Sequence, residues 1–578
     1  MAIKRYAATA DTTITNAYKS GLTLRGTGSN MGASDALEVF SIYDQASTVT
    51  DFGGGGKAVK AEREYARTLV QFTSSLIVSD RSAGTVPADA KYYLRLFNVT
   101  HGGTLPTNYT MDVWALGQAW EEGTGLDMEE YGDIGAASWI NRTSTPSQYA
   151  SGSITVSTNP TDTSTPATIH VGVGGYFVQA NVGANADATA TALSSALEAN
   201  SDITSLVNVA VSGKVVSLTA SAASGDDITI TVSGSGSDDT GVVIKSGNTL
   251  TGSNDYTAWT TAGGHVGGSK VGTFTFTEGT EDLLVDVTSK VSDWIGGAAD
   301  YGFLIKLSQS HEEEPRSFYT KKFSGRGSEY WFKRPCIEAR WDSSKADDRS
   351  NFYASSSLRS DNANTLFLYN YQDGTLINIP GNPTVTCRVY SDSGLSTQVD
   401  AQTATNPETG IYKASLIWDN AATTAYVKWH EVGGATFHTE SISVNTHSAP
   451  DTSVAPNYVI SLTNLKQKYT RNEDARFRLY TRLKDWSPTI YTVASKAVEN
   501  NILPNAYYKI ERLSDEFTVL DYGTGSTSHT KLSYDKDGNY FDFDMSLLEA
   551  GYSYGIKFMF YLNGEYREQP EVFKFKVV

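Results

Sequence analysis

Cysteine is scarce in this sequence of 578 residues, because Cys336 and Cys387 are the only two. We place them in different domains below, so the sequence offers no disulfide framework and stability must come from packed cores. Long apolar runs are also missing, since no stretch of about 18 apolar residues occurs. The residues from Met1 to Asp11 are polar and lack the apolar centre of a signal peptide. We therefore expect neither a signal peptide nor a membrane span.

Basic residues are the minority. There are 46 Lys and Arg against 64 Asp and Glu, which gives a formal net charge of -18. A surface with this charge repels a phosphate backbone at long range, so we expect no nucleic acid partner. The same acidity suits a particle surface, an extracellular module or a cation-binding protein, and it does not choose among them.

The composition favours strands over helices. Hydrophobic residues make up 39% and charged residues 19% of a chain that is rich in Gly, Ser, Thr and Tyr, a balance typical of short strands joined by turns. The chain is too long for one hydrophobic core, and its length indicates about four domains. We predict a mainly β fold of several sandwiches, of the jelly-roll or immunoglobulin-like type, with one small α+β inserted domain.

The first predicted sandwich is interrupted. Residues 37–40, 67–72 and 92–97 alternate with the period of half-buried strands, and no helix is evident in this part. Aromatic residues almost vanish at about Ser151 and return at Tyr256. An insertion at an exposed loop leaves the host fold intact, so we join 1–150 with 256–342 as one domain.

The interrupting segment, 151–255, is predicted to form the α+β domain. Asp187 is the expected N-cap of one helix over 188–200, in which Leu193 and Leu197 share a face. The flanking apolar runs predict strands, at 169–177, 207–211, 215–220 and 228–232.

Two further β domains are predicted in the C-terminal part. Residues 362–447 have strands spaced by turn signals, as in an immunoglobulin-like sandwich. After a Pro-containing linker, 457–578 alternates between apolar and polar positions and is predicted to be the last sandwich. Within it, Asp537-Gly538 predicts a hairpin turn; the run lacks the Glu that would close a calcium loop.

Several short motifs resemble a known family, the DNRLRE-type domains. In chain order they are ADTTI at 10–14, GSNMGASDALEV at 28–39, LVQF at 69–72, DVW at 112–114, WEEG at 120–123, LVDVT at 284–288, GFLI at 302–305 and RPCIEARW at 334–341. The resemblance implies a β-sandwich of the kind found in surface, carbohydrate-associated and phage structural proteins. This chain departs from it by carrying an insert between Trp139 and Trp259. The insert, in DATATAL at 187–193 and VVSLTA at 215–220, is similar to a small α/β unit of phage tail, baseplate and fibre proteins.

An acidic loop is the candidate metal site. Calcium takes six to eight oxygen ligands, mainly from carboxylates and carbonyls. Two interpretations are open, a calcium site or a solvated acidic loop. The candidate ligands are Glu121, Glu122, Asp127, Glu129, Glu130 and Asp133.

Catalytic patterns are absent from the sequence. We find no Gly-x-Ser-x-Gly elbow and no His-Glu-x-x-His in a plausible context, and the pair Glu121 and Glu130 would be a glycosidase pair only if a cleft held both. We therefore predict no catalytic residues, no enzyme activity and no cofactor other than the candidate calcium. Six tryptophans of the first sandwich are expected to be mostly core, with one or two left for a ligand.

Taken together, these features predict a phage virion structural protein of a tail, neck or fibre assembly. Its expected partners are other virion proteins, copies of itself as a homo-oligomer, and a host surface glycan. Two alternatives remain open: a capsid decoration protein and a secreted carbohydrate-binding surface protein.

Overall fold

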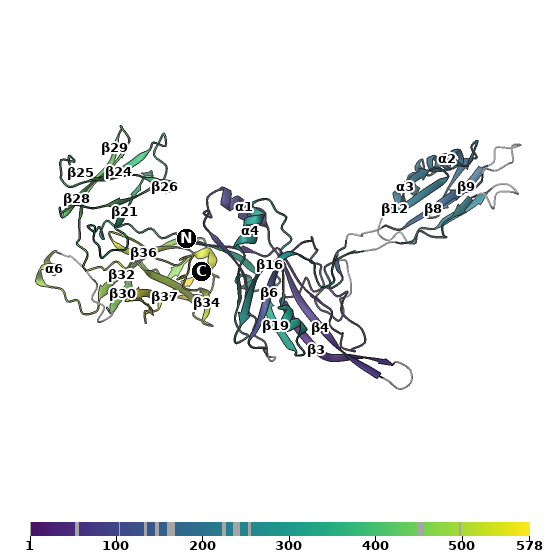
Figure 1. Cartoon of the computed structure of the whole chain (residues 1–578), viewed down its shortest axis with the longest axis horizontal. Coiled ribbons are helices and arrows are strands. Elements are labelled where there is room, and N and C mark those ends of the chain that lie inside the picture. The colour runs from purple at the N-terminus through teal and green to yellow at the C-terminus, as the bar shows by residue number, and fades with distance from the viewer. Residues whose placement is uncertain are drawn as a thin grey trace. The chain divides into compact units, whose positions relative to one another are not determined.

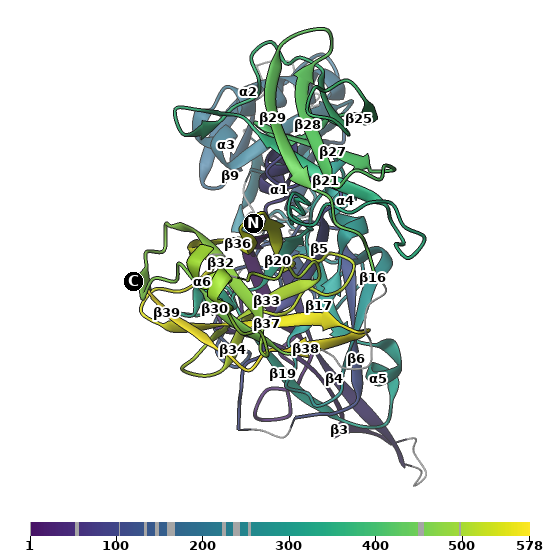
Figure 2. The same cartoon turned by 90° about the vertical axis from the view of Figure 1, so that its left-hand side faces the viewer.

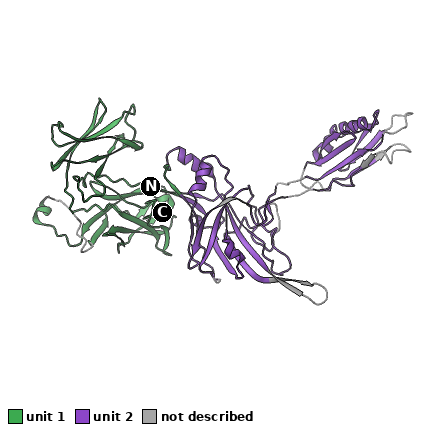
Figure 3. Ribbon diagram, in the orientation of Figure 1, with its two compact units in different colours: residues 1–4, 86–91, 339–578 green, residues 5–85, 92–338 purple. Residues whose placement is uncertain are grey.

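The computed structural model describes residues 2–51, 57–102, 105–131, 136–144, 149–158, 168–221, 227–234, 243–252, 256–448, 456–495 and 499–578. The chain divides into two compact units, Met1–Lys4 with Val86–Lys91 and Ala339–Val578, and Arg5–Thr85 with Tyr92–Glu338 (Figure 3). Antiparallel strands dominate both units (Figures 1 and 2). The predicted mainly β, multi-sandwich fold is confirmed.

The larger unit contains a seven-stranded sheet in which the order is β16-β6-β18-β4-β3-β19 and β2 also pairs with β4. Its strands are β2 (Ala10–Thr15), β3 (Ala36–Asp51), β4 (Lys57–Gln71), β6 (Tyr109–Leu116), β16 (Val266–Phe276), β18 (Phe303–Leu307) and β19 (Phe318–Ser324). A second sheet has the order β1-β20-β5-β17. Its strands are β1 (Ile3–Ala7), β5 (Lys91–Leu96), β17 (Leu283–Asp286) and β20 (Cys336–Arg340).

The two sides of the insert meet in a small ladder. Strand β7 (Asn141–Thr143) precedes the insert and pairs with β15 (Thr257–Ala258), which follows it. Thr143 lies opposite Thr257. The chain therefore enters and leaves the inserted segment at neighbouring strands, as an insertion requires.

Helices occur where the sequence pattern predicted only sheet. Helix α1 (Ser74–Ser82) lies against α4 (Thr288–Ile295), and α5 (Gln309–Glu313) and the short η3 (Trp331–Lys333) follow. The prediction that the first segment has no helix is wrong. The sequence pattern did not indicate α1, because this helix buries only Ile77 and so shows no amphipathic repeat.

Most of the six tryptophans are core, as predicted. Trp120, Trp139, Trp259 and Trp294 are buried, whereas Trp114 and Trp331 are half-buried. Two buried indoles donate to backbone carbonyls, Trp120 to Tyr301 at 3.0 Å and Trp259 to Ser138 at 2.9 Å. These bonds satisfy the polar end of each ring, so the apolar body can fill the core without an unpaired donor.

The inserted segment has a core of its own, built from residues between Ala150 and Leu250. Two sheets have the orders β10-β9-β13 and β11-β12-β8-β14. The elements are β8 (Ser151–Val156), β9 (Thr168–Val173), β10 (Tyr176–Asn181), α2 (Ala186–Glu198), α3 (Ser201–Leu206), β11 (Val207–Ser212), β12 (Val215–Ala220), β13 (Ile230–Gly234) and β14 (Val243–Lys245).

Three local predictions for this segment need correction. The strand predicted over 169–177 is a hairpin, because Gly174 and Gly175 adopt φ of +60° and +89° and turn the chain between β9 and β10. One helix was predicted, but the structure has two. The Asn200 side chain accepts from the backbone N–H groups of Asp202 and Ile203 and so starts α3. The N-cap of α2 is Asn185 and not Asp187. Leu193 and Leu197 are both fully buried, as their spacing predicted.

Replacing Asn185 with alanine is expected to destabilise the inserted segment by about 1 kcal/mol. The Asn185 Oδ1 accepts from the backbone N–H of Ala188 at 2.8 Å, and alanine cannot make this bond. Amide hydrogen exchange of α2 measures the change. Asp187→Ala is the matched control in the same turn, and the cap assignment is wrong if both variants accelerate exchange equally.

The immunoglobulin-like region packs two sheets around Trp418 and Trp429, both fully buried. The sheet orders are β21-β27-β26 and β25-β24-β28-β29. The strands are β21 (Ala363–Tyr369), β22 (Tyr371–Gln372), β23 (Thr375–Leu376), β24 (Val385–Tyr390), β25 (Gln398–Thr403), β26 (Thr405–Glu408), β27 (Ile411–Ile417), β28 (Thr424–Glu431) and β29 (Thr436–Ser443). Cys387 is buried in this core and Cys336 is buried in the larger unit, and neither forms a disulfide bond.

The C-terminal region has an aromatic core in which Tyr508 stacks on Phe541 with ring centroids 4.0 Å apart. The sheet orders are β30-β32-β36-β35 and β31-β39-β37-β33-β34, and β38 pairs with β37. The elements are β30 (Tyr458–Leu462), β31 (Lys468–Tyr469), β32 (Asp474–Leu483), α6 (Ile490–Ser495), β33 (Ala506–Arg512), β34 (Phe517–Leu520), β35 (Ser533–Asp535), β36 (Gly538–Asp544), η4 (Met545–Leu547), β37 (Ser553–Leu562), β38 (Glu565–Glu568) and β39 (Phe573–Val577). The hairpin predicted at Asp537-Gly538 is confirmed, because Asp535 lies opposite Gly538.

Candidate functional site

The predicted calcium ligands lie on the loop that follows β6, and hydrogen bonds within the chain already occupy most of them. The Glu121 carboxylate accepts from the backbone N–H of Ser144 at 2.8 Å. The Glu122 carboxylate accepts two bonds from the Arg326 guanidinium. Neither acid therefore points its oxygens toward a shared centre with the rest of the loop.

The remaining candidate ligands that the structure describes do not share a common partner either. The Asp127 carboxylate accepts from the N–H groups of Glu129 and Glu130, at 2.8 and 2.9 Å, and so caps its own turn. Glu129 accepts from the N–H of Ser20, and Glu130 is exposed. Asp133 lies outside the described residues. Among the residues that the structure describes, no three His, Cys, Asp or Glu side chains are grouped as a metal ion would require.

Two of the loop's contacts belong to a partly buried charge cluster that the sequence did not reveal. The Arg326 guanidinium bonds the Glu122 carboxylate through Nε at 2.9 Å, and the backbone N–H of Arg326 donates to Asp11 Oδ2 at 2.5 Å. The backbone N–H of Asp11 in turn donates to Glu122 at 2.8 Å. The cluster ties β2, the acidic loop and the segment after β19 together.

Asp11 is the most perturbed acid of this cluster. Its side chain is 1% exposed, and burial raises its pKa to about 7. The hydrogen bond from the Arg326 backbone lowers the pKa, and the neighbouring Glu122 charge raises it, but both effects are smaller than that of burial. Asp11 thus titrates near neutral pH inside the sandwich.

Asn30 is a second buried link to the acidic loop. Its Nδ2 donates to the carbonyls of Glu122 and Ala137, at 2.9 and 3.0 Å, and its Oδ1 accepts from Gly125 N–H at 2.8 Å. A side chain at Gly32 would collide with the Glu122 carbonyl, because a Cβ there would lie 2.0 Å from the oxygen. Residues 28–39, quoted for the family resemblance, therefore help to hold the acidic loop in place.

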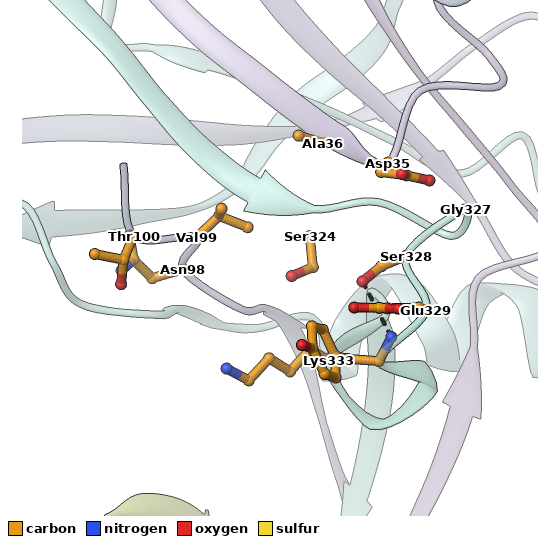
Figure 4. A pocket seen from close by; sticks show the side chains of 11 residues that line it. Asp35, Ala36, Asn98, Val99, Thr100, Ser324, Gly327, Ser328, Glu329 and Lys333 are labelled. Atoms are coloured by element: carbon orange, nitrogen blue, oxygen red, sulfur yellow. Dashed lines mark hydrogen bonds between the residues drawn. The ribbon is translucent and has the colours of Figure 1, made fainter. Parts of the chain in front are cut away.

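A polar pocket of about 490 Å³ opens nearby in the same unit, a volume typical of small-molecule sites (Figure 4). Three segments build it: the start of β3, the chain after β5, and the chain from the end of β19 to η3. Its lining is Asp35, Ala36, Asn98, Val99, Thr100, Ser324, Gly327, Ser328, Glu329, Tyr330 and Lys333.

Backbone hydrogen bonds fix these three segments to one another. Gly325 N–H donates to the Asp35 carbonyl at 2.7 Å, and Ser324 N–H donates to the Phe97 carbonyl at 2.9 Å. The Arg334 guanidinium donates twice to the Ser328 carbonyl, at 3.1 and 3.0 Å. The pocket wall is therefore pre-formed.

A buried lysine supports one side of the pocket. Lys321 is fully buried, and its Nζ donates to Asn98 Oδ1 at 2.5 Å and to the carbonyls of Gly279 and Glu281 at 2.7 and 2.9 Å. Burial lowers the pKa of Lys321 to about 8, although Asp282 and Glu281 act in the opposite direction. Because Lys321 holds the oxygen of the Asn98 amide, the amide nitrogen is the end that can donate to a ligand.

Sequence reasoning missed Lys321, Arg326 and the pocket. It included Asn30, Asp35 and Ala36 only as part of the family resemblance. The pocket joins positions near 35, 98 and 330, and no spacing rule within a strand or helix connects positions so far apart. His311 is half-buried on α5, and the centre of its ring lies 4.7 Å from that of Phe318.

Comparisons with known proteins give no family. No family model matches the chain, and no curated protein matches it. The described part of the chain has no helix long and apolar enough to cross a bilayer.

Among solved structures, the chain is similar to fibronectin(III)-like modules of CbhA from Clostridium thermocellum, with 14% identity over 41% of this chain and 93% of that chain and a TM-score of 0.13. It is similar to the adhesin InvE of Yersinia pseudotuberculosis, with 13% identity over 38% of this chain and 55% of that chain and a TM-score of 0.13. It is also similar to the BSP domain of a biofilm associated protein, with 9% identity over 99% of this chain and 96% of that chain and a TM-score of 0.14. Scores this low carry no argument about what the chain does.

Proposed function

We propose that this chain is a structural and attachment protein of a phage virion, in a tail, neck or fibre assembly. The supporting observation is its construction from successive β regions with separate hydrophobic cores, which suits a protein that transmits load and presents surfaces. The resemblance to DNRLRE-type domains and to phage tail units, quoted above, supports a location in a phage virion.

The charged residues favour the same proposal. In the larger unit, hydrogen bonds among the buried Asp11 and the half-buried Arg326 and Glu122 link strands and loops to one another. In the immunoglobulin-like region, Arg349 lies between Asp347 and Glu440 and likewise joins separate segments. Such groups serve rigidity, which an assembly protein needs.

Exposed sheet edges offer a route to partners. Strand β29 ends the sheet β25-β24-β28-β29, and most of its eight residues are exposed or half-buried. Its backbone can pair with a strand of another copy or of another virion protein, which is one way to form the proposed homo-oligomer. Repeated copies would then multiply weak contacts with a host surface.

Imaging of intact particles that carry a label at Val578 tests the proposal. We expect the label on the tail, neck or fibre of each particle, in several symmetry-related copies. A label spread over the head would instead indicate a capsid decoration protein. A label on no particle would reject the virion assignment and favour the secreted carbohydrate-binding alternative.

A further inference from the structure

We propose that the polar pocket at Asp35, Asn98 and Tyr330 binds a neutral saccharide. The inference rests on the attachment function proposed above and names the chemistry that the attachment would recognise. Two observations support it: the residues that line the pocket, and the hydrogen bonds that fix the segments of its wall.

The lining combines acceptors and donors around one small space. Figure 4 shows Asn98 and Thr100 on one side of the pocket, and Ser328 and Glu329 on the other. Vicinal hydroxyl groups of a sugar both donate and accept, so carboxylates, an amide and hydroxyls can each pair with them. A purely apolar ligand would leave these groups without partners.

The charges select against an anionic ligand. Asp35 and Glu329 are both exposed at the pocket, while Lys333 is the single cation of its described lining. Two carboxylates against one ammonium repel a phosphate, a sulfate or an acidic sugar. The chemistry therefore fits a neutral hexose or N-acetylhexosamine better than a charged one.

Tyr330 supplies the apolar contact that a sugar ring needs. It is 43% exposed, and its ring lies edge to face with that of Phe332 at a centroid distance of 6.2 Å. The backbone carbonyl of Tyr330 accepts from Lys333 N–H at 2.9 Å, which fixes the turn beneath the ring. An aromatic side chain combines a rigid apolar body with a polar end and so suits a ligand with an apolar face and hydroxyl edges.

The test uses the purified full chain on a printed array of neutral hexose and N-acetylhexosamine oligosaccharides, with their sialylated and sulfated counterparts. We expect binding to one class of neutral oligosaccharide and weaker binding to its acidic counterparts. The best neutral ligand is then titrated in solution. Tyr330→Ala is expected to weaken its binding about tenfold, and Tyr330→Phe to keep it within about twofold.

Tyr319→Ala is the matched control, because Tyr319 lies on β19 of the same unit, is 56% exposed and does not line the pocket. Its binding should equal that of the unchanged chain. The inference is overturned if no array saccharide binds, if acidic saccharides bind better, or if Tyr330→Ala binds as tightly as Tyr319→Ala. If particles carry the label at Val578 but no saccharide on the array binds, only the pocket inference is rejected. Saccharide binding without labelled particles would reject only the virion assignment.

Discussion

Replacing Glu338 with alanine is expected to destabilise the larger unit by about 3–5 kcal/mol, since removal of one partner leaves buried charges unpaired. The Glu338 carboxylate on β20 is fully buried and bonds two guanidinium groups. Arg5 Nε lies 2.9 Å from its Oε1, and Arg95 Nη1 lies 3.1 Å from the same atom. Denaturant unfolding of the full chain, followed by a probe in this unit, measures the loss.

The charge of Arg95 depends on this carboxylate. Burial lowers the pKa of Arg95, but the negative charges of Glu338 and Asp282 more than compensate and raise it above its usual value. The guanidinium also lies 4.4 Å from the centre of the Phe97 ring, which confines it further. Without Glu338, Arg95 keeps Asp282 while Arg5 loses the carboxylate, so the cost is larger than that of one missing hydrogen bond.

Asp542→Ala, followed by a probe in the C-terminal region where Asp542 lies, is the control for this prediction. Asp542 pairs with Arg476 through two hydrogen bonds, but both side chains are about half exposed, at 41% and 51%. Solvent screens such a pair, and its loss is expected to change stability by about 0–1 kcal/mol. Equal effects of the two substitutions would show that burial does not determine the strength of the Glu338 ion pairs.

Asp11 is expected to make the stability of the larger unit depend on pH. Its pKa is about 7 when folded, against the ordinary value of 3.8 that it regains on unfolding. Between these values the folded chain holds a proton that the unfolded chain has released, so stability decreases as pH rises from about 4 to 7 and then stays level. The full difference amounts to about 4 kcal/mol.

Asp11→Asn isolates this effect from all other titrations. The amide keeps an oxygen that can accept from the backbone N–H of Arg326, but it carries no charge. The melting temperature of the variant relative to the unchanged chain is expected to increase as pH rises from 4 to 8. The control is Asp293→Asn, whose side chain is 57% exposed. A difference between Asp11→Asn and the unchanged chain that does not vary with pH would mean that Asp11 is ionised throughout.

The sequence by itself determined the elements that depend on near neighbours. Alternation of apolar and polar residues predicted the strands, the spacing of Leu193 and Leu197 predicted the buried face of α2, and Asp537-Gly538 predicted a hairpin. Each of these signals lies within a few consecutive residues, where backbone geometry alone decides which side chains share a face. The same locality explains the errors, since Asn185 and Asp187 are both good caps and only the path of the chain chose Asn185.

Tertiary structure alone decided which charges are buried and where the pocket lies. Asp11, Glu122 and Arg326 are ordinary charged residues in the sequence, and they become a cluster only because three distant segments pack together. The lining of the pocket likewise comes from the chain near Asp35, Asn98 and Tyr330. Contacts between such distant positions depend on how whole sheets pack, and a single sequence carries no periodic signal for them.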